Sequence, residues 1–366
     1  IFRPLERHDP GIVRKKRDLA VSAPEVHNFA AADGLTLRLT RYRGGDKGPL
    51  LFTHGLGVSS RIFSIDTIET NLLEYMHNAG YDCWLLDYRA SIDLPYATQG
   101  WTADEVAQFD YAPAITLIRD QTGRSSVQVI AHCYGATTFT MAMLSGLRGV
   151  RLAVISQIST DVIVPFYPQR LLAYLRLPSL LEKFGVTAVN ARATRADSIW
   201  GRMLDGLIRI AVPFQRGERS RSATSNRITA LYGQLYKSAQ LNEATFEHGL
   251  PEMFGEANIA AFKQLARIAR CKHLVDADGH NAYLENDDVS GLAAIPICFI
   301  HGQENACFRP ESTELTLKRL QAAAPSQPFT RHVIPGYGHI DCIFGKNAAR
   351  DVYPHILAHL EKSADG

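Results

Sequence analysis

The stretch "VIAHCYGATT", residues 129–138, joins an apolar strand pattern to the start of a helical pattern and places Cys133 at the junction. Small residues stand two positions before and two positions after this cysteine, at Ala131 and Gly135. A nucleophile on a tight strand-to-helix turn needs such neighbours, because larger side chains would collide with adjacent backbone. The pattern therefore predicts an exposed, reactive thiol, and the alternative is a small buried core cysteine.

The turn also places Cys133 at a helix N-terminus, where the helix dipole and free N–H groups favour a negative charge. We therefore expect the pKa of its thiol to fall from about 8.5 toward neutrality.

Short apolar runs alternate with amphipathic stretches on both sides of this turn, which is typical of an α/β fold with a mostly parallel sheet flanked by helices. The expected strands are 25–31, 35–42, 49–53, 81–87, 126–131, 151–157, 295–302 and 330–336. The expected helices are 66–79, 103–121 and 347–362, and Pro113 should kink or break the second of them.

Between the sixth and seventh expected strands the pattern changes to Leu-, Tyr-, Phe- and Met-rich segments with helical periods. This predicts an inserted helical cap at 161–285, with an N-terminal arm at 1–24 and one core made of 25–160 and 286–366. The cap's apolar stretches indicate either a bulky hydrophobic substrate or ordinary packing against the sheet; they are Leu171 to Leu181 and Trp200 to Phe214.

Composition limits the classes of partner. The formal net charge is +2, so no global field would recruit nucleic acid or an anionic membrane. The basic run at 14–17 is interpreted as part of a solvated tail. No run of about 18 apolar residues and no signal-peptide pattern occurs, so a cytoplasmic location is expected. The chain starts with Ile1, which indicates removed residues or a piece of a longer protein.

The six cysteines show no zinc-type spacing, and no dinucleotide-binding glycine pattern is present. We therefore expect free thiols in a reducing compartment, with no metal and no cofactor.

Two further segments complete a catalytic pattern. "LLFTHGLG", residues 50–57, is an apolar strand that ends in a glycine-bracketed loop. In this architecture, that loop and the residue after the nucleophile supply the two backbone N–H groups of an oxyanion hole, here from Leu56 and Tyr134. "VIPGYGHIDCIFG", residues 333–345, follows the last strand and offers His339 as the partner of the thiol.

The third member of the catalytic group is ambiguous in the sequence. A carboxylate is expected three residues after the glycine of "IPICFIHG", to orient the imidazole, but that position is Asn305. An Asn carboxamide can accept the imidazole N–H, as in Cys-His-Asn arrangements. The spacing from the glycine favours Asn305, and the need for a carboxylate favours Glu304. The third interpretation is that this segment is an ordinary surface loop without a catalytic role.

These blocks together resemble the α/β-hydrolase superfamily. "THGLGVSSRIF", "LLEYMHNAGYDCWLLDYR", "DEVAQFDYAPAITLIRDQTG" and "VQVIAHCYGATT" are similar to core blocks of acid lipases and of hydrolase domains attached to cholesterol-oxidase-like flavin oxidoreductases. The resemblance covers about residues 50–145 and, more weakly, 295–360. It implies an α/β-hydrolase fold, with Cys133 and Asn305 at positions where acid lipases have serine and aspartate.

The resulting hypothesis is a cysteine hydrolase that cleaves an ester, lactone or thioester of a hydrophobic substrate through an acyl-cysteine. A second hypothesis is an acyltransferase similar to polyhydroxyalkanoate synthases, which also carry a cysteine elbow and a Gly-His-Ile segment. A third is a non-catalytic module associated with a flavin oxidoreductase.

Overall fold

The computed structural model describes residues 5–165, 177–211 and 221–362. Within these ranges, eight strands form one sheet in the order β1-β2-β4-β3-β5-β6-β9-β10. β2 runs antiparallel to β1 and β4, and every other neighbouring pair is parallel. The strands are β1 (Pro24–Ala30), β2 (Thr36–Tyr42), β3 (Pro49–Thr53), β4 (Asp82–Asp87), β5 (Val127–His132), β6 (Val150–Ser156), β9 (Ile297–Gly302) and β10 (Thr330–Ile334).

The burial of the strands follows from their place in the sheet. Every residue of β3, β4, β5 and β9 is buried, because helices cover both faces of the parallel centre. The edge strand β1 instead alternates between exposed and half-buried residues. The mostly parallel sheet expected from the sequence is thus confirmed.

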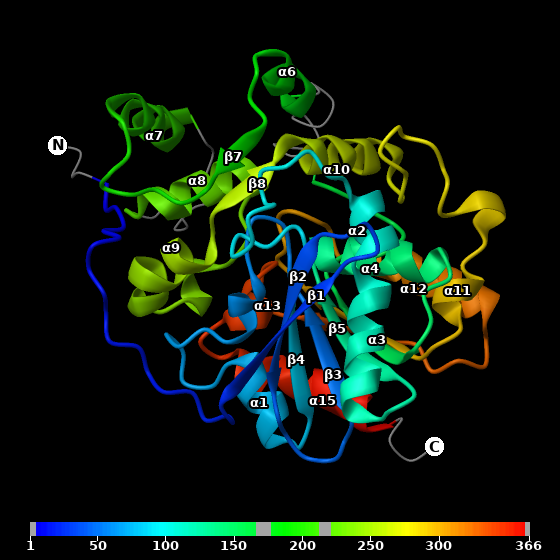
Figure 1. The fold of residues 1–366 in the computed structure, drawn as a ribbon. Helices are drawn as coiled ribbons and strands as arrows, with labels where there is room; N and C mark the ends of the chain where they lie inside the picture. Colours follow the sequence, from blue (N-terminus) through cyan, green and yellow to red (C-terminus); the bar gives the residue numbers. More distant parts are fainter. Residues whose placement is uncertain (1–4, 166–176, 212–220, 363–366) are drawn as a thin grey trace.

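Helices pack on both faces of this sheet and form two apolar clusters (Figure 1). One cluster lies under α2, α3, α4, α10, α11 and α12, and the other lies under α1, α8, α9, α13, α14 and α15. The helices are α1 (Leu72–Asn78), α2 (Ala103–Phe109), α3 (Tyr111–Thr122), α4 (Tyr134–Leu144), α6 (Leu177–Lys183), α7 (Ile199–Ala211), α8 (Ala223–Tyr232), α9 (Leu250–Met253), α10 (Ile259–Cys271), α11 (Ser290–Ala293), α12 (Glu311–Ala323), α13 (Asp341–Phe344), α14 (Ala348–Asp351) and α15 (Tyr353–Lys362).

Two helix boundaries differ from the sequence-based expectation. α1 begins only at Leu72, because the Asn71 side chain accepts the Glu74 N–H and the Glu74 carboxylate accepts the Asn71 N–H, which together form a capping box. The break in 103–121 lies at Asp110, which separates α2 from α3, and Pro113 is the third residue of α3. A proline in the first turn of a helix sacrifices no hydrogen bond, so it marks the start of α3 instead of a kink inside it.

The chain between β6 and β9 contains helices α6 to α11 and a two-stranded pair, β7 (Ala188–Asn190) with β8 (Glu256–Asn258). In Figure 1, α6, α7, α8 and α10 gather over one end of the sheet. Parts of the predicted apolar stretches, 171–176 and 212–214, lie outside the described residues. The division into core and cap remains a prediction.

The basic run in the N-terminal arm is not a solvated tail. Arg14 donates to both Asp66 and Glu252, and Arg17 donates to both oxygens of Glu74. The sequence did not indicate these partners, because they lie about 50 to 240 positions away along the chain. The arm is therefore fastened to α1, to α9 and to the loop before α1.

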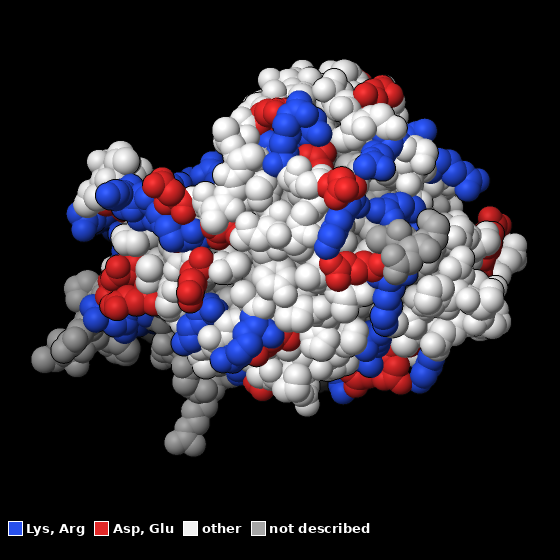
Figure 2. All heavy atoms as spheres, turned by 90° about the horizontal axis from the view of Figure 1, so that it is seen from below, with Lys and Arg blue, Asp and Glu red and all other residues white. Residues whose placement is uncertain are grey.

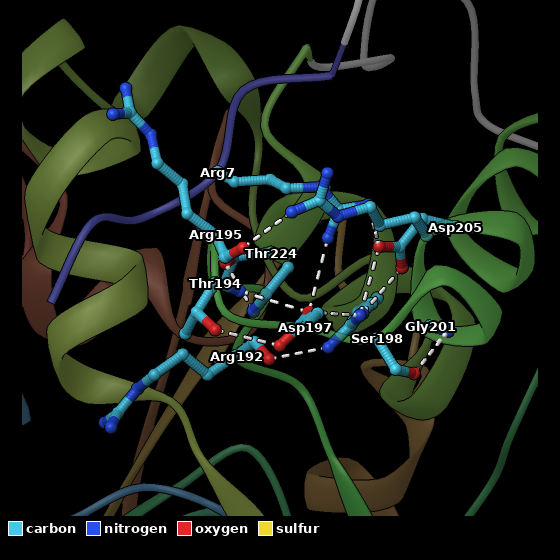
Figure 3. Close-up of polar contacts among 12 residues, drawn as sticks. Arg7, Arg192, Thr194, Arg195, Asp197, Ser198, Gly201, Asp205 and Thr224 are labelled. Atoms are coloured by element: carbon cyan, nitrogen blue, oxygen red, sulfur yellow. Dashed lines mark hydrogen bonds and ion pairs between the residues drawn. The ribbon is translucent and has the colours of Figure 1, made fainter.

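The same arm reaches the segment around α7. Arg7 donates to Asp197 and to Asp205, and Arg227 pairs with the same two carboxylates (Figure 3). Asp205 is fully buried on the inner side of α7. This ionic cluster ties the arm, α7 and α8 together.

Charges elsewhere are mixed in sign. Figure 2 shows Lys and Arg interspersed with Asp and Glu on the face it displays, without a large patch of one sign. Among the described residues, no helix has both the length and the apolar character that a membrane crossing requires.

We predict that Asp205→Ala lowers the free energy of unfolding by about 3 kcal/mol, because it leaves two largely buried guanidinium groups with Asp197 as their shared carboxylate. Denaturant unfolding of the purified variant would measure this loss. Asp9→Ala is the matched control, since Asp9 pairs with the exposed Arg195 and should cost less than about 1 kcal/mol. Equal losses in the two variants would contradict the prediction.

Candidate active site

The turn between β5 and α4 has a backbone shape that most residues avoid. Cys133 is its central residue, with φ 56° and ψ −122°, and it immediately precedes the first residue of α4. A positive φ is strained for a residue with a side chain, so surrounding contacts must hold it. The backbone N–H of Cys133 donates to the carbonyl of Ser156, and its carbonyl accepts from the N–H of Thr137.

Two glycines let this turn sit against the end of β3. A Cβ on Gly135 would lie 2.8 Å from Thr53 Oγ1 and 2.9 Å from Thr53 O, and closer still to the carbonyl of His54. A Cβ on Gly55 would lie 3.2 Å from Cys133 Cβ. The steric reason expected for the glycine at 135 is thus confirmed, because the end of β3 occupies the space that a side chain at this position would need.

The backbone N–H groups of Tyr134 and Leu56 each act to lower the pKa of the Cys133 thiol, which places them beside it. Tyr134 is the first residue of α4, and Leu56 lies in the loop after β3. Gly57, next to Leu56, has φ 72°, a left-handed conformation that glycine adopts without strain. An oxyanion hole requires two such donors facing the substrate oxygen, so Leu56 and Tyr134 remain the candidates for that role.

The expected lowering of the thiol pKa is wrong. Burial raises the pKa of Cys133 to about 12, and the Tyr134 and Leu56 amides only partly oppose this rise. Removal from water disfavours the charged thiolate, and here that effect exceeds the stabilisation by the helix N-terminus. The resting residue is a neutral thiol.

His339 lies in the loop between β10 and α13 and is fully buried. Its backbone N–H donates to the carbonyl of Leu235, and its ring packs against Phe308 and against His132, the residue before the nucleophile. Burial, with smaller effects from His132 and His301, holds the pKa of His339 well below its usual range. The ring is therefore neutral.

Asn305, and not Glu304, contacts this ring. The Nδ2 atom of Asn305 lies 3.0 Å from Nδ1 of His339. Glu304 is exposed and forms an ion pair with Lys237 at 3.1 Å. The structure thus brings His339 and Asn305 together and directs Glu304 elsewhere.

The other ring nitrogen of His339, Nε2, is buried and has no hydrogen-bond partner within the described part of the chain. That nitrogen is the one available to face a substrate or the thiol.

The orientation of the Asn305 amide is fixed by two backbone donors. Its Oδ1 accepts from the N–H of Cys307 at 2.8 Å and from the N–H of Phe308 at 3.0 Å. Nδ2 is therefore the atom that faces His339, and it donates to the ring. This direction is opposite to the one expected from the sequence, in which the Asn305 carboxamide accepts from the ring.

Two residues of the site were missed. Gln157 follows β6 with φ 81° and is fully buried, and its Oε1 accepts from Nδ2 of Asn305 at 3.0 Å. A polar residue directly after a buried parallel strand was the available signal, because such positions meet at the carboxyl edge of the sheet.

Tyr232, the last residue of α8, is the second residue of the site that the sequence did not indicate. Its buried hydroxyl lies against Gly57, where a Cβ would collide with it, and it has no hydrogen-bond partner in the described ranges. No sequence pattern singles it out.

Two further histidines near the thiol are also neutral. Burial lowers the pKa of His132 to about 3, and it also lowers the pKa of His54. Over the described ranges, no group of three or more His, Cys, Asp or Glu residues is placed to hold a metal ion. The chemistry available here is that of a thiol, an imidazole and two backbone amides.

Comparison with known proteins points to one family. The profile of the alpha/beta hydrolase family matches residues 50–352. Triacylglycerol lipase 1 of Arabidopsis thaliana is 20% identical over 363 residues, covering 90% of this chain and 85% of the lipase.

Solved structures agree on the fold. The esterase PF2001 of Pyrococcus furiosus has a TM-score of 0.53 at 13% identity, covering 100% of this chain and 99% of its own. A lipase in an open form has a TM-score of 0.60 at 14% identity, covering 94% and 100%.

We predict that Gly135→Ala destabilises the protein by about 2 to 3 kcal/mol, because the added methyl group meets backbone that cannot move without distorting the elbow. Thermal or denaturant unfolding would measure the effect. Gly100→Ala is the control, since nothing lies within 4 Å of its added Cβ. An unfolding free energy for Gly135→Ala equal to that of the parent would contradict the packing described.

We also predict that iodoacetamide at pH 7.5 modifies Cys271 before Cys133. Cys271 is exposed, whereas Cys133 is partly buried and burial keeps its thiol protonated. Peptide mass spectrometry over a time course would give the order of modification. Faster labelling of Cys133 would show that its thiol is ionised at neutral pH.

Proposed function

Because the chain belongs to the alpha/beta hydrolase family, we propose that it hydrolyses carboxylic esters and that Cys133 is the nucleophile. The observation that carries this proposal is the strained β5–α4 turn, which holds Cys133 at positive φ beside the backbone N–H groups of Leu56 and Tyr134. In this arrangement the two N–H groups can face the oxygen of a tetrahedral intermediate formed at the sulfur.

The proposed reaction has two halves. The sulfur of Cys133 bonds to the ester carbonyl carbon while the thiol loses its proton, and the oxyanion accepts from the Leu56 and Tyr134 N–H groups. The carbon–oxygen bond to the alcohol then breaks, and the alcohol leaves with a proton. Water cleaves the acyl-cysteine and regenerates the thiol. We assign the thiol proton to the departing alkoxide oxygen, to which His339, oriented by Asn305, donates a hydrogen bond from Nε2.

A hydrophobic acyl or alcohol group fits the surroundings. The relatives include a triacylglycerol lipase and, over 27% of this chain and 20% of the relative, Sterol esterase 2 of Saccharomyces cerevisiae, at 24% identity. The described helices between β6 and β9 also expose large apolar side chains, on α7 and just after α6: Phe184, Ile199, Trp200, Met203, Leu204 and Leu207. Lactones and thioesters present the same electrophilic carbonyl and remain within the proposal.

One observation favours a second candidate, a module that has lost catalysis. The thiol and the imidazole are both neutral, and the Asn305 amide donates to the ring where a triad carboxylate would accept. Acyl transfer to an alcohol, the cytoplasmic location and the association with a flavin oxidoreductase also remain predictions from the sequence.

We predict that Cys133→Ala lowers turnover of p-nitrophenyl esters by about 10³-fold or more, because the covalent route is lost. Cys307→Ala is the matched control, since this buried neighbour donates from sulfur to backbone carbonyls and takes no part in the proposed reaction. Intact-mass spectrometry after exposure to a small ester panel should show an acyl adduct on the parent and none on Cys133→Ala.

If Cys133→Ala hydrolysed the esters at the rate of the parent, Cys133 would not be the nucleophile. Absence of both turnover and adduct in the parent would favour the non-catalytic candidate. Release of CoA with polymer formation from a hydroxyacyl-CoA would identify the acyltransferase.

A further inference from the structure

A chain of buried hydrogen bonds leads from the backbone of β9 to the imidazole of His339. The N–H of Gly302 donates to Oε1 of Gln157 at 3.1 Å, which fixes the orientation of that amide. The same Oε1 accepts from Nδ2 of Asn305 at 3.0 Å, and Asn305 Nδ2 also faces His339 Nδ1 at 3.0 Å. Gln157, Asn305 and His339 are all buried.

Each hydrogen bond in this series has only one possible donor. Gln157 Oε1 can only accept, so its partner at position 305 must be a donor. Asn305 meets this requirement because the Cys307 and Phe308 N–H groups occupy its oxygen and turn its nitrogen toward the ring. His339 Nδ1 therefore accepts, and in a neutral imidazole the proton then resides on Nε2.

We propose that Gln157 selects an amide instead of a carboxylate at position 305, and that the Asn305 amide in turn keeps the proton of His339 on Nε2. Gln157 and Asn305 are thus positioning residues that act through His339. The inference rests on the proposed function for its catalytic meaning, but its chemical content concerns the resting protein alone.

The Nε2–H form has a direct consequence for the thiol. With its proton on Nε2, the ring has no lone pair there to accept the proton of Cys133. A second proton, on Nδ1, would point directly at the N–H of Asn305. The hydrogen-bond network therefore also disfavours the imidazolium form of the ring. The resting pair is therefore thiol and neutral imidazole, and not thiolate and imidazolium.

Two carboxylates near the pair are hydrogen-bonded to other groups. Asp341, on α13, accepts at Oδ2 from the N–H groups of Gly338 and Lys237. Asp87, on β4, lies 3.9 Å from Nε2 of His54 and is matched by Arg38. The remaining titratable neighbours have pKa values shifted toward their neutral forms: His54 beside β3, His132 on β5, Tyr88 after β4, Tyr134 on α4, Tyr232 on α8, His301 on β9, and Cys307 and Cys342 beside the His339 loop.

Gln157 has a second branch that matches the first. Its Nε2 donates to Ser156 Oγ at 3.1 Å, and that hydroxyl lies 3.0 Å from Nδ1 of His132. The serine hydroxyl keeps a proton and a second lone pair, so the direction of its bond with His132 follows the tautomer of that ring. The Gln157 carboxamide thus contacts polar groups on both sides of the nucleophile and fixes the direction on the Asn305 side.

The parent protein gives the first test. The ¹⁵N shifts of the His339 imidazole, assigned by loss of the signal in His339→Gln, should show the Nε2–H form between pH 6 and 9. The labelling rate of Cys133 should rise throughout that range without a plateau, since its thiol stays protonated. A Nδ1–H signal, or a labelling plateau near neutral pH, would overturn the proposal.

The variants test the roles of the two amides. In Asn305→Asp, a carboxylate would accept from Nδ1–H and free Nε2 as a base, so Cys133 labelling at pH 7.5 should rise about tenfold or more, one pKa unit being a tenfold change. The rise should be larger in Asn305→Asp with Gln157→Leu, because the Gln157 oxygen no longer opposes the carboxylate. Equal effects of Asn305→Asp in both backgrounds would show that Gln157 does not select the amide.

Two controls isolate the effect. Gln128→Leu removes another buried amide, on β5, that donates to the carbonyl of Leu360, and Glu304→Gln changes the exposed neighbour of Asn305. Both should keep the parental tautomer and labelling rate, and a change in either that matched Asn305→Asp would overturn the proposal. These readouts need no ester turnover, so an inactive protein with a Nε2–H imidazole would refute the proposed function while leaving this inference intact.

Discussion

The close approach of the β5–α4 turn to the end of β3 is the constraint on which the site depends. Gly135 lies where no side-chain carbon fits, against the carbonyl of His54 and the backbone of Thr53. Because this contact is made by backbone, it fixes the relative positions of the Leu56 N–H, the Tyr134 N–H and the Cys133 sulfur without help from any flexible side chain. The strained φ of Cys133 is held by the same contact, which is how a fold can maintain an unfavourable backbone conformation at a functional position.

Electrostatic neutrality is the second property of the site. Ion pairs occur elsewhere in this chain, where they fasten the N-terminal arm through Arg14 and Arg17 and hold α7 through Asp205. At Cys133 and His339 themselves, burial favours the neutral forms, and the hydrogen bonds that orient the ring come from the amides of Asn305 and Gln157. Dipoles of this kind cost less to bury than charges and can be oriented in advance, which suits them to stabilise an oxyanion that exists only briefly.

Local patterns predicted the parts of this structure that local geometry determines. The strands, the elbow and the position of Asn305 follow from periodicity and from short spacings around glycines, so the sequence indicated them correctly. The thiol pKa, the direction of the Asn305 hydrogen bond and the role of Gln157 depend on burial and on partners up to 148 positions away, which a local pattern does not report. The same reason accounts for the N-terminal arm, whose arginines are charge pairs only once the fold brings Asp66 and Glu252 to them.

In the reaction we propose, the cysteine at 133 and the asparagine at 305 depend on each other physically. A serine hydroxyl is a weak nucleophile that needs a strong adjacent base, and a carboxylate accepting from the imidazole N–H is what supports that base. An amide that donates to Nδ1 instead keeps the ring proton on Nε2. A serine at 133 would then face a ring that cannot accept the hydroxyl proton. A thiol depends less on such a base, because sulfur is more nucleophilic and loses its proton more readily than a hydroxyl. The Gln157 oxygen, pinned by the N–H of Gly302, therefore favours an amide at 305 and, through it, a sulfur at the elbow.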